Sequence, residues 1–135
     1  MSNASDTRWL YRLEDKTFRF NRRAVESRSM KSLRSLAQRV WKREAPNRSL
    51  PRIVAGRGAK TKGYALWSFC EGFSYIELAR HQRTILVLLH ELTHALGPCV
   101  HGPKFVRLYF RLLREYAGYS RVFLQGVAAG RGIYI

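Results

Sequence analysis

The segment of residues 82–96 is predicted to form a helix that is apolar on nearly every side, and such a helix has to be buried. Its apolar surface is interrupted by His90, Glu91 and His94. Burying imidazoles and a carboxylate costs free energy unless these groups find partners. Whatever fold the chain adopts must therefore enclose three polar side chains and supply the groups that satisfy them.

The spacing of these residues predicts a metal site. His90 and His94 are four residues apart, so a helix presents both imidazoles on one face. His101 follows after a turn through Gly97 and Pro98 and is the natural third ligand, with a polar residue at a helix start as the alternative. Three histidines of this kind suit zinc. Glu91 lies one step round the helix, where it reaches a metal-bound water and acts as general base.

The cysteines and the remaining histidine receive simpler interpretations. Cys99 would close the metal site as a fourth ligand and make it structural, but we expect a small buried residue, because Glu91 would then have no task. Cys70 is expected in a strand core and His81 at the surface. Two cysteines do not make a disulfide framework, which favours a reducing, cytoplasmic setting.

The N-terminal third is basic and predicted to be partly helical. Met1 to Ala4 looks like an expression-tag scar and is left out of fold reasoning. Residues 7–20 alternate loosely and predict a short strand or an extended arm. Residues 22–45 predict a helix with an apolar stripe, ended by Pro46. The stripe consists of Val25, Leu33, Leu36, Ala37, Val40 and Trp41.

The middle of the chain predicts a small sheet. Ile53 and Val54 form a short strand candidate. Residues 64–70 and 74–79 are rich in aromatic and β-branched side chains, and a turn candidate at residues 71–72 separates them, so they predict an antiparallel hairpin.

The C-terminal part predicts one further helix and one further strand. Pro103 suits a first helical turn and opens a helix over residues 103–116, which Gly118 ends. A short strand is expected near residues 121–124. Three tyrosines are candidate donors to a developing oxyanion, with core packing as the simpler interpretation of each. They are Tyr109, Tyr116 and Tyr119.

The net charge of the chain indicates which kinds of partner it can attract. The 135 residues contain 25 Lys plus Arg against nine acids, a net charge of +16. Such a surface attracts nucleic acid, anionic membrane or acidic protein, or is simply solvated. The densest stretch runs from Arg19 to Arg43, and we expect any nucleic-acid binding to be non-specific and centred there. On that helix Arg28, Lys31, Gln38 and Lys42 lie away from the apolar stripe. We expect no membrane span, and the sequence leaves the oligomeric state unknown.

The motif residues also resemble a known family. His90-Glu91-Leu92-Thr93-His94, followed by Gly97-Pro98 and His101-Gly102-Pro103-Lys104-Phe105, resembles the SprT-like branch of the zincin metallopeptidases. The resemblance implies zinc held by His90, His94 and His101 and Glu91 as catalytic acid/base. It covers about residues 85–110. The loop before the third histidine is shorter than is usual in that family, and in this the chain is similar to compact minimal zincins.

Together these features predict one α+β, zincin-like domain over residues 5–135, with an N-terminal helix, a small antiparallel sheet, the metal-binding helix and a following helix. The function we expect is zinc-dependent hydrolysis of peptide bonds in a peptide or protein substrate, with Glu91 as general acid/base. The alternatives are a basic nucleic-acid-binding module with a structural zinc site, and a hydrolase of non-peptide amides.

Overall fold

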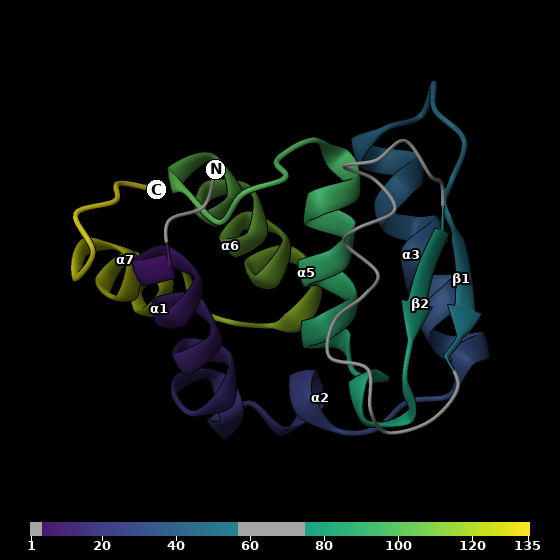
Figure 1. Ribbon diagram of the computed structural model, residues 1–135, viewed down its shortest axis with the longest axis horizontal. Helices are drawn as coiled ribbons and strands as arrows, with labels where there is room; N and C mark the ends of the chain where they lie inside the picture. Colours follow the sequence, from purple (N-terminus) through teal and green to yellow (C-terminus); the bar gives the residue numbers. More distant parts are fainter. Residues whose placement is uncertain (1–3, 57–74) are drawn as a thin grey trace.

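A computed structural model of the chain describes residues 4–56 and 75–135. Helices dominate the described residues, and one pair of short strands accompanies them. Figure 1 shows helix α5 in the middle of the molecule, with α1, α6 and α7 on one side and α3 with the strand pair on the other. The mixed α+β class expected from the sequence is confirmed.

The N-terminal segment is helical. Helix α1 spans Ala4–Asp15, and a short 3₁₀ helix follows at Thr17–Phe20. The predicted strand or extended arm over residues 7–20 is therefore wrong. Leu10 and Leu13 are spaced one helical turn apart and both are buried, so helical periodicity decides against the alternating pattern.

The predicted helix over residues 22–45 is divided in two. Helix α2 spans Arg22–Val25 and helix α3 spans Met30–Glu44. Ser29 caps α3, since its hydroxyl accepts the N–H of Ser32, and serine favours this role over the helix interior. Apart from Val25, which is partly buried outside α3, the expected stripe is confirmed, because its remaining five members are buried on α3.

The sheet differs from the expected hairpin. Strand β1 spans Arg52–Ala55, which confirms the strand predicted at Ile53 and Val54. Strand β2 spans Tyr75–Leu78 and pairs with β1 in parallel, so the antiparallel arrangement is wrong. The predicted strand at residues 64–70, its turn and Cys70 lie outside the described residues. A parallel pair needs a long crossover, and residues 56–74 connect β1 to β2 in the sequence.

The C-terminal half is helical throughout. A 3₁₀ turn at Arg80–Gln82 leads into α5, Ile85–Leu96, which begins at the cap Thr84. Helix α6 spans Pro103–Ala117 and ends at Gly118, whose φ of 81° is left-handed. Helix α7 spans Arg121–Ala129, so the strand predicted near residues 121–124 is wrong.

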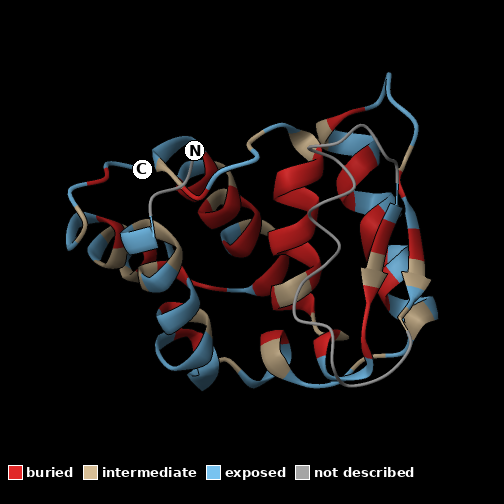
Figure 2. Cartoon of the chain, in the orientation of Figure 1, coloured by how far each residue is buried: buried red, intermediate tan, exposed pale blue. Residues whose placement is uncertain are grey.

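The core is built around α5, as the sequence required. Figure 2 shows α5 buried along most of its length. Leu88, Leu89 and Leu92 are fully buried, and Phe105 and Tyr109 of α6 are fully buried beside them. The described residues contain no helix that combines the length and the apolar character needed to cross a membrane.

Candidate metal centre

Two of the predicted ligands lie on α5. His90 and His94 stand one turn apart on that helix, and their ring centroids are 5.1 Å from each other. Their exposed fractions are 4% and 1%, so both imidazoles are inside the protein. The helix therefore delivers two buried nitrogen ligands to one side, as the spacing predicted.

The third histidine reaches the same place through a short return loop. Helix α5 ends at Gly97, whose φ of 155° is a conformation that side-chain-bearing residues rarely adopt. The loop leads to His101, just before α6 begins at Pro103. His101 is 6% exposed, and its ring centroid is 4.9 Å from that of His94. The structure thus brings His101 together with His90 and His94 in the protein interior, although it also lies just before a helix start.

The three imidazoles point their Nε2 atoms at one another. Nε2 of His101 is 3.1 Å from Nε2 of His94 and 3.2 Å from Nε2 of His90. We call His90, His94 and His101 the histidine cluster, and it is able to hold a metal ion. Converging lone pairs repel each other unless a proton or a cation lies between them.

The outward Nδ1 atoms of the histidine cluster are all engaged. Nδ1 of His94 donates to the carbonyl oxygen of Pro98 at 2.7 Å. Nδ1 of His90 is 2.6 Å from a carboxylate oxygen of Glu14, and Nδ1 of His101 is 3.2 Å from the Thr7 hydroxyl. A proton on Nδ1 leaves Nε2 as a bare lone pair, which is the tautomer a metal requires.

Helix α1 forms the wall of the cluster, and the sequence reading missed it. Thr7, Tyr11 and Glu14 are spaced by four and three residues, so they share one face of α1. The Tyr11 ring centroid lies 6.2 Å from that of His90 and 5.7 Å from that of His101. This polar stripe was a signal available in the sequence, but only to a reading that made residues 7–14 helical.

Glu91 is buried beside the ligands and only partly satisfied. Its side chain is 3% exposed, and its Oε2 atom has no hydrogen-bond partner among the described residues. Burial raises the pKa of Glu91 to about 7; the charge of His90 opposes the shift and that of Glu14 adds to it. A carboxyl group near half-protonation at neutral pH is able to accept and return a proton.

The imidazoles of the cluster are tuned differently. Burial lowers the pKa of His94 to about 3 and that of His101 to about 4, and the charge of His90 adds to both shifts. Burial also works to lower the pKa of His90, but the charge and hydrogen bond of Glu14, with the charge of Glu91, raise it overall. His94 and His101 are therefore neutral at neutral pH, and a neutral imidazole is able to give an electron pair to a metal. His90 has a carboxylate partner of the kind that increases the basicity of metal-bound histidines.

The tyrosines predicted as oxyanion donors are not placed for that role. The Tyr109 hydroxyl donates to Glu14 at 2.6 Å, and the Tyr119 hydroxyl donates to the Phe18 carbonyl at 2.7 Å. Tyr116 lies in a different cavity. Core packing is the confirmed interpretation of all three, whereas Tyr11, which the sequence did not single out, stands beside the cluster and is 43% exposed.

The two other candidate ligands lie apart from the cluster. Cys99 is exposed and disulfide-bonded, so the expectation of a small buried residue is wrong. His81 is exposed, as predicted. Among the described residues, the potential ligands that gather at this point are the three histidines.

Comparison with known proteins adds no relative. No family model, no curated protein and no solved structure matches the chain. The likeness to the SprT-like family therefore rests on the motif residues between His90 and Phe105 alone.

Proposed function

We propose that the protein is a zinc-dependent metallopeptidase with a zincin-like active site, in which the histidine cluster holds zinc. The observation that carries the proposal is the convergence of three Nε2 atoms whose imidazoles are held from outside at Nδ1. Nitrogen ligands at about 2.0–2.1 Å from a tetrahedral zinc ion stand about 3.3 Å from each other. The observed separations of 3.1 and 3.2 Å are close to that value.

An open coordination position favours catalysis over a purely structural role. Structural zinc sites are closed by four protein ligands, and the cluster offers three among the described residues. Glu91, buried with an unpartnered oxygen, has no task in a closed site. These two features count against the alternative of a nucleic-acid-binding module that keeps zinc only for stability.

The proposed reaction is hydrolysis of a peptide bond. Zinc, when bound, polarises the scissile carbonyl and lowers the pKa of the attacking water. Glu91 accepts the proton of that water at Oε2 and delivers it to the leaving amine. Tyr11, partly exposed at the cluster, donates a hydrogen bond to the developing oxyanion. Burial, followed by the charges of Glu14 and Glu91, raises the pKa of Tyr11, which keeps this donor protonated.

We assign the alignment of the substrate peptide to the strand pair. The sequence offers either edge of the predicted hairpin, residues 64–70 or 74–78, to a substrate that adds as a further strand, and β2 belongs to the second of these. Such pairing would explain a preference for extended peptides over small amides. Hydrolysis of a non-peptide amide would use the same residues in the same roles. Measuring turnover of both kinds of substrate distinguishes the two activities.

The test replaces Glu91 by glutamine, which is nearly isosteric but does not accept the proton. We expect Glu91→Gln to retain one zinc per chain and to lose about 10²- to 10⁴-fold in kcat. Tyr11→Phe should also retain zinc and lose about tenfold or more. Zinc content and turnover of an unfolded casein substrate are measured on the same samples, with a panel of small amides alongside.

Glu26→Gln is the matched control, because it makes the same chemical change at a largely exposed position outside the proposed active site, and it should keep both zinc and turnover. Unchanged turnover in Glu91→Gln would discard the general-base role. Loss of zinc from that variant would give Glu91 a structural part instead. Turnover of small amides without casein cleavage would replace the peptidase by the amide hydrolase.

A further inference from the structure

A polar cavity lies against α3, away from the histidine cluster. It has a volume of about 230 Å³. Its polar lining comes from the α2 and α3 region and from the end of α6. These residues are Arg23, Arg28, Ser32, Ser35, Arg39 and Tyr116, and we call the cavity they line the α3 pocket.

Two buried atoms at the α3 pocket have no partner. They are Nε of Arg28 and the hydroxyl of Tyr116, and neither is hydrogen-bonded among the described residues. Tyr116 is 8% exposed, so bulk water does not satisfy its hydroxyl. A buried donor left without a partner costs about 1–3 kcal/mol, and buried polar groups in folded proteins nearly always have one. Two such groups at one cavity indicate a missing acceptor.

The charge of the α3 pocket has one sign. Its lining contains three arginines and no carboxylate. The guanidinium of Arg39 lies over the ring of Tyr116, 5.9 Å from the centroid. Glu26 pairs with a terminal nitrogen of Arg28 at 2.9 Å, yet it is largely exposed and leaves Nε unengaged. Ser32 stands in the first turn of α3, the positive end of the helix dipole.

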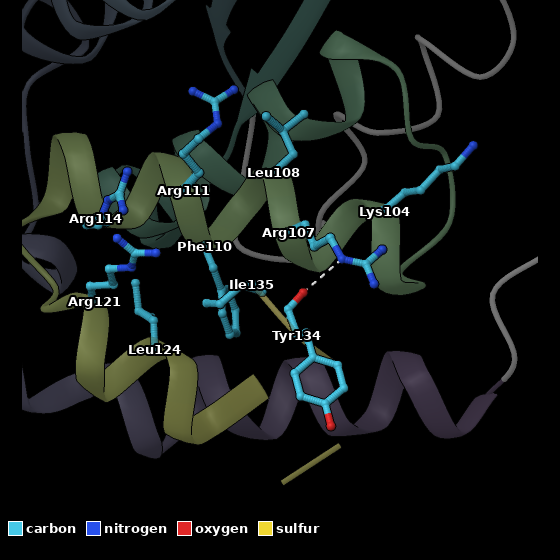
Figure 3. A pocket seen from close by; sticks show the side chains of 10 residues that line it. All are labelled: Lys104, Arg107, Leu108, Phe110, Arg111, Arg114, Arg121, Leu124, Tyr134 and Ile135. Atoms are coloured by element: carbon cyan, nitrogen blue, oxygen red, sulfur yellow. Dashed lines mark hydrogen bonds between the residues drawn. The ribbon is translucent and has the colours of Figure 1, made fainter. Parts of the chain in front are cut away.

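A second basic cavity differs from the α3 pocket in how its hydrogen-bond donors are satisfied. It has a volume of about 500 Å³ and lies along α6 and α7, as Figure 3 shows. Its Arg111 is held by two hydrogen bonds to Glu44, and Nε of Arg107 donates to the carbonyl of Tyr134. None of the buried, unpartnered donors of the described residues belongs to its lining. That cavity gathers basic and apolar side chains, whereas the α3 pocket also has buried hydrogen-bond donors without a partner.

We propose that the α3 pocket binds a phosphate group, either inorganic phosphate or a small phosphomonoester. A phosphate group presents several acceptor oxygens and about two negative charges, which match the unpartnered donors and the arginines together. The pocket has room for such a group with a few waters, since one water occupies about 30 Å³. Buried donors suit a terminal phosphate that enters the cavity better than the backbone of a nucleic acid that passes over it. The site is independent of the proposed peptidase chemistry.

Calorimetric titration of the whole protein with inorganic phosphate, and separately with glycerol phosphate, tests the proposal at fixed ionic strength. We expect saturable binding of one phosphate group per chain. Arg28→Gln should weaken it by about tenfold or more, because it removes a charge-assisted hydrogen bond. Tyr116→Phe should weaken it by about threefold to tenfold. Whichever of the two compounds binds more tightly identifies the source of the phosphate group.

Lys31→Gln is the matched control, since it removes one positive charge from the same helix at an exposed position outside the pocket. Its affinity for phosphate should change by less than about twofold. Thermal unfolding verifies that each variant is folded, and Arg28→Lys keeps the charge while removing Nε should Arg28→Gln fail to fold. Absence of saturable binding, or equal losses in Lys31→Gln and Arg28→Gln, would overturn the proposal. Displacement of phosphate by a DNA duplex, with the same dependence on Arg28 and Tyr116, would assign the pocket to nucleic acid instead.

Discussion

The histidine cluster is buried and the α3 pocket opens to the surface, and these two polar regions gather opposite kinds of atom. In the cluster, the outward nitrogens are hydrogen-bonded and the Nε2 nitrogens face one another. At the α3 pocket, buried donor groups of Arg28 and Tyr116 have no hydrogen-bond partner among the described residues. The first arrangement calls for a cation and the second for an anion.

The comparison also separates two ways of holding a ligand. The cluster histidines are fixed by partners on α1 and on the loop after α5, so the three ligand atoms are in place before an ion arrives. The arginines of the α3 pocket are mostly exposed and less constrained, which costs ordering entropy on binding. We therefore expect the metal to be held far more tightly than the phosphate group.

The largest expected effect is the loss of metal from the cluster. His94→Ala or His101→Ala should lower zinc affinity by more than about 100-fold, beyond what loss of an outer partner does. Elemental analysis of dialysed protein measures it, and His81→Ala, an exposed histidine, should keep one zinc per chain. Unchanged zinc in His101→Ala would break the three-ligand assignment.

A smaller effect is expected from the partner of His90. Glu14→Gln removes the negative charge that raises the pKa of His90 and should lower zinc affinity by about 10- to 100-fold. Competition with a zinc-binding dye gives the affinity. Asp15→Asn makes the same change at the exposed neighbouring position of α1 and should leave the affinity unaltered. Equal zinc affinities in Glu14→Gln and Asp15→Asn would mean that the three histidines alone determine the affinity.

The smallest effect compares two buried hydroxyls. Tyr109→Phe removes a hydroxyl that donates to Glu14 at 2.6 Å and should cost about 1–3 kcal/mol of unfolding free energy. Tyr116→Phe removes a buried hydroxyl without a partner and should change stability by less than about 0.5 kcal/mol, or increase it. Urea unfolding in phosphate-free buffer measures both. A reversed order would mean that the Tyr116 hydroxyl is satisfied in solution.

The part of the molecule that carries the histidine cluster was largely predictable from the sequence. Helices α5 and α6, the stop at Gly97 and the convergence of His94 and His101 follow from local signals: apolar periodicity, glycine and proline at the boundaries, and ligand spacing. The wall of the cluster was not predictable in the same way. Residues 7–14 were expected to be a strand or an extended arm, and the contacts that place them at the cluster join residues 76 and 94 positions apart in the sequence.

Two other features depend on contacts that no local pattern encodes. Strands β1 and β2 are distant in sequence, and their parallel pairing depends on tertiary contacts. The composition of each segment indicates only that it forms a strand. Arg28 was predicted on the exposed face of a helix but lies in the extended segment between α2 and α3. Its backbone N–H donates there to the carbonyl of Arg83 at 2.8 Å. Its side chain lines the α3 pocket and is 25% exposed.

The carboxylate of Glu14 has one more consequence, because it joins three helices at once. It receives hydrogen bonds from His90 on α5 and Tyr109 on α6 while belonging to α1. Binding equilibria that share a group are reciprocal: whatever an ion gains from a docked α1, α1 gains from the ion. Hydrogen exchange of the α1 amides should therefore slow when zinc is added and quicken when a chelator removes it. The exchange rates of the α1 amides would thus report whether the histidine cluster holds an ion, and the measurement needs no substrate.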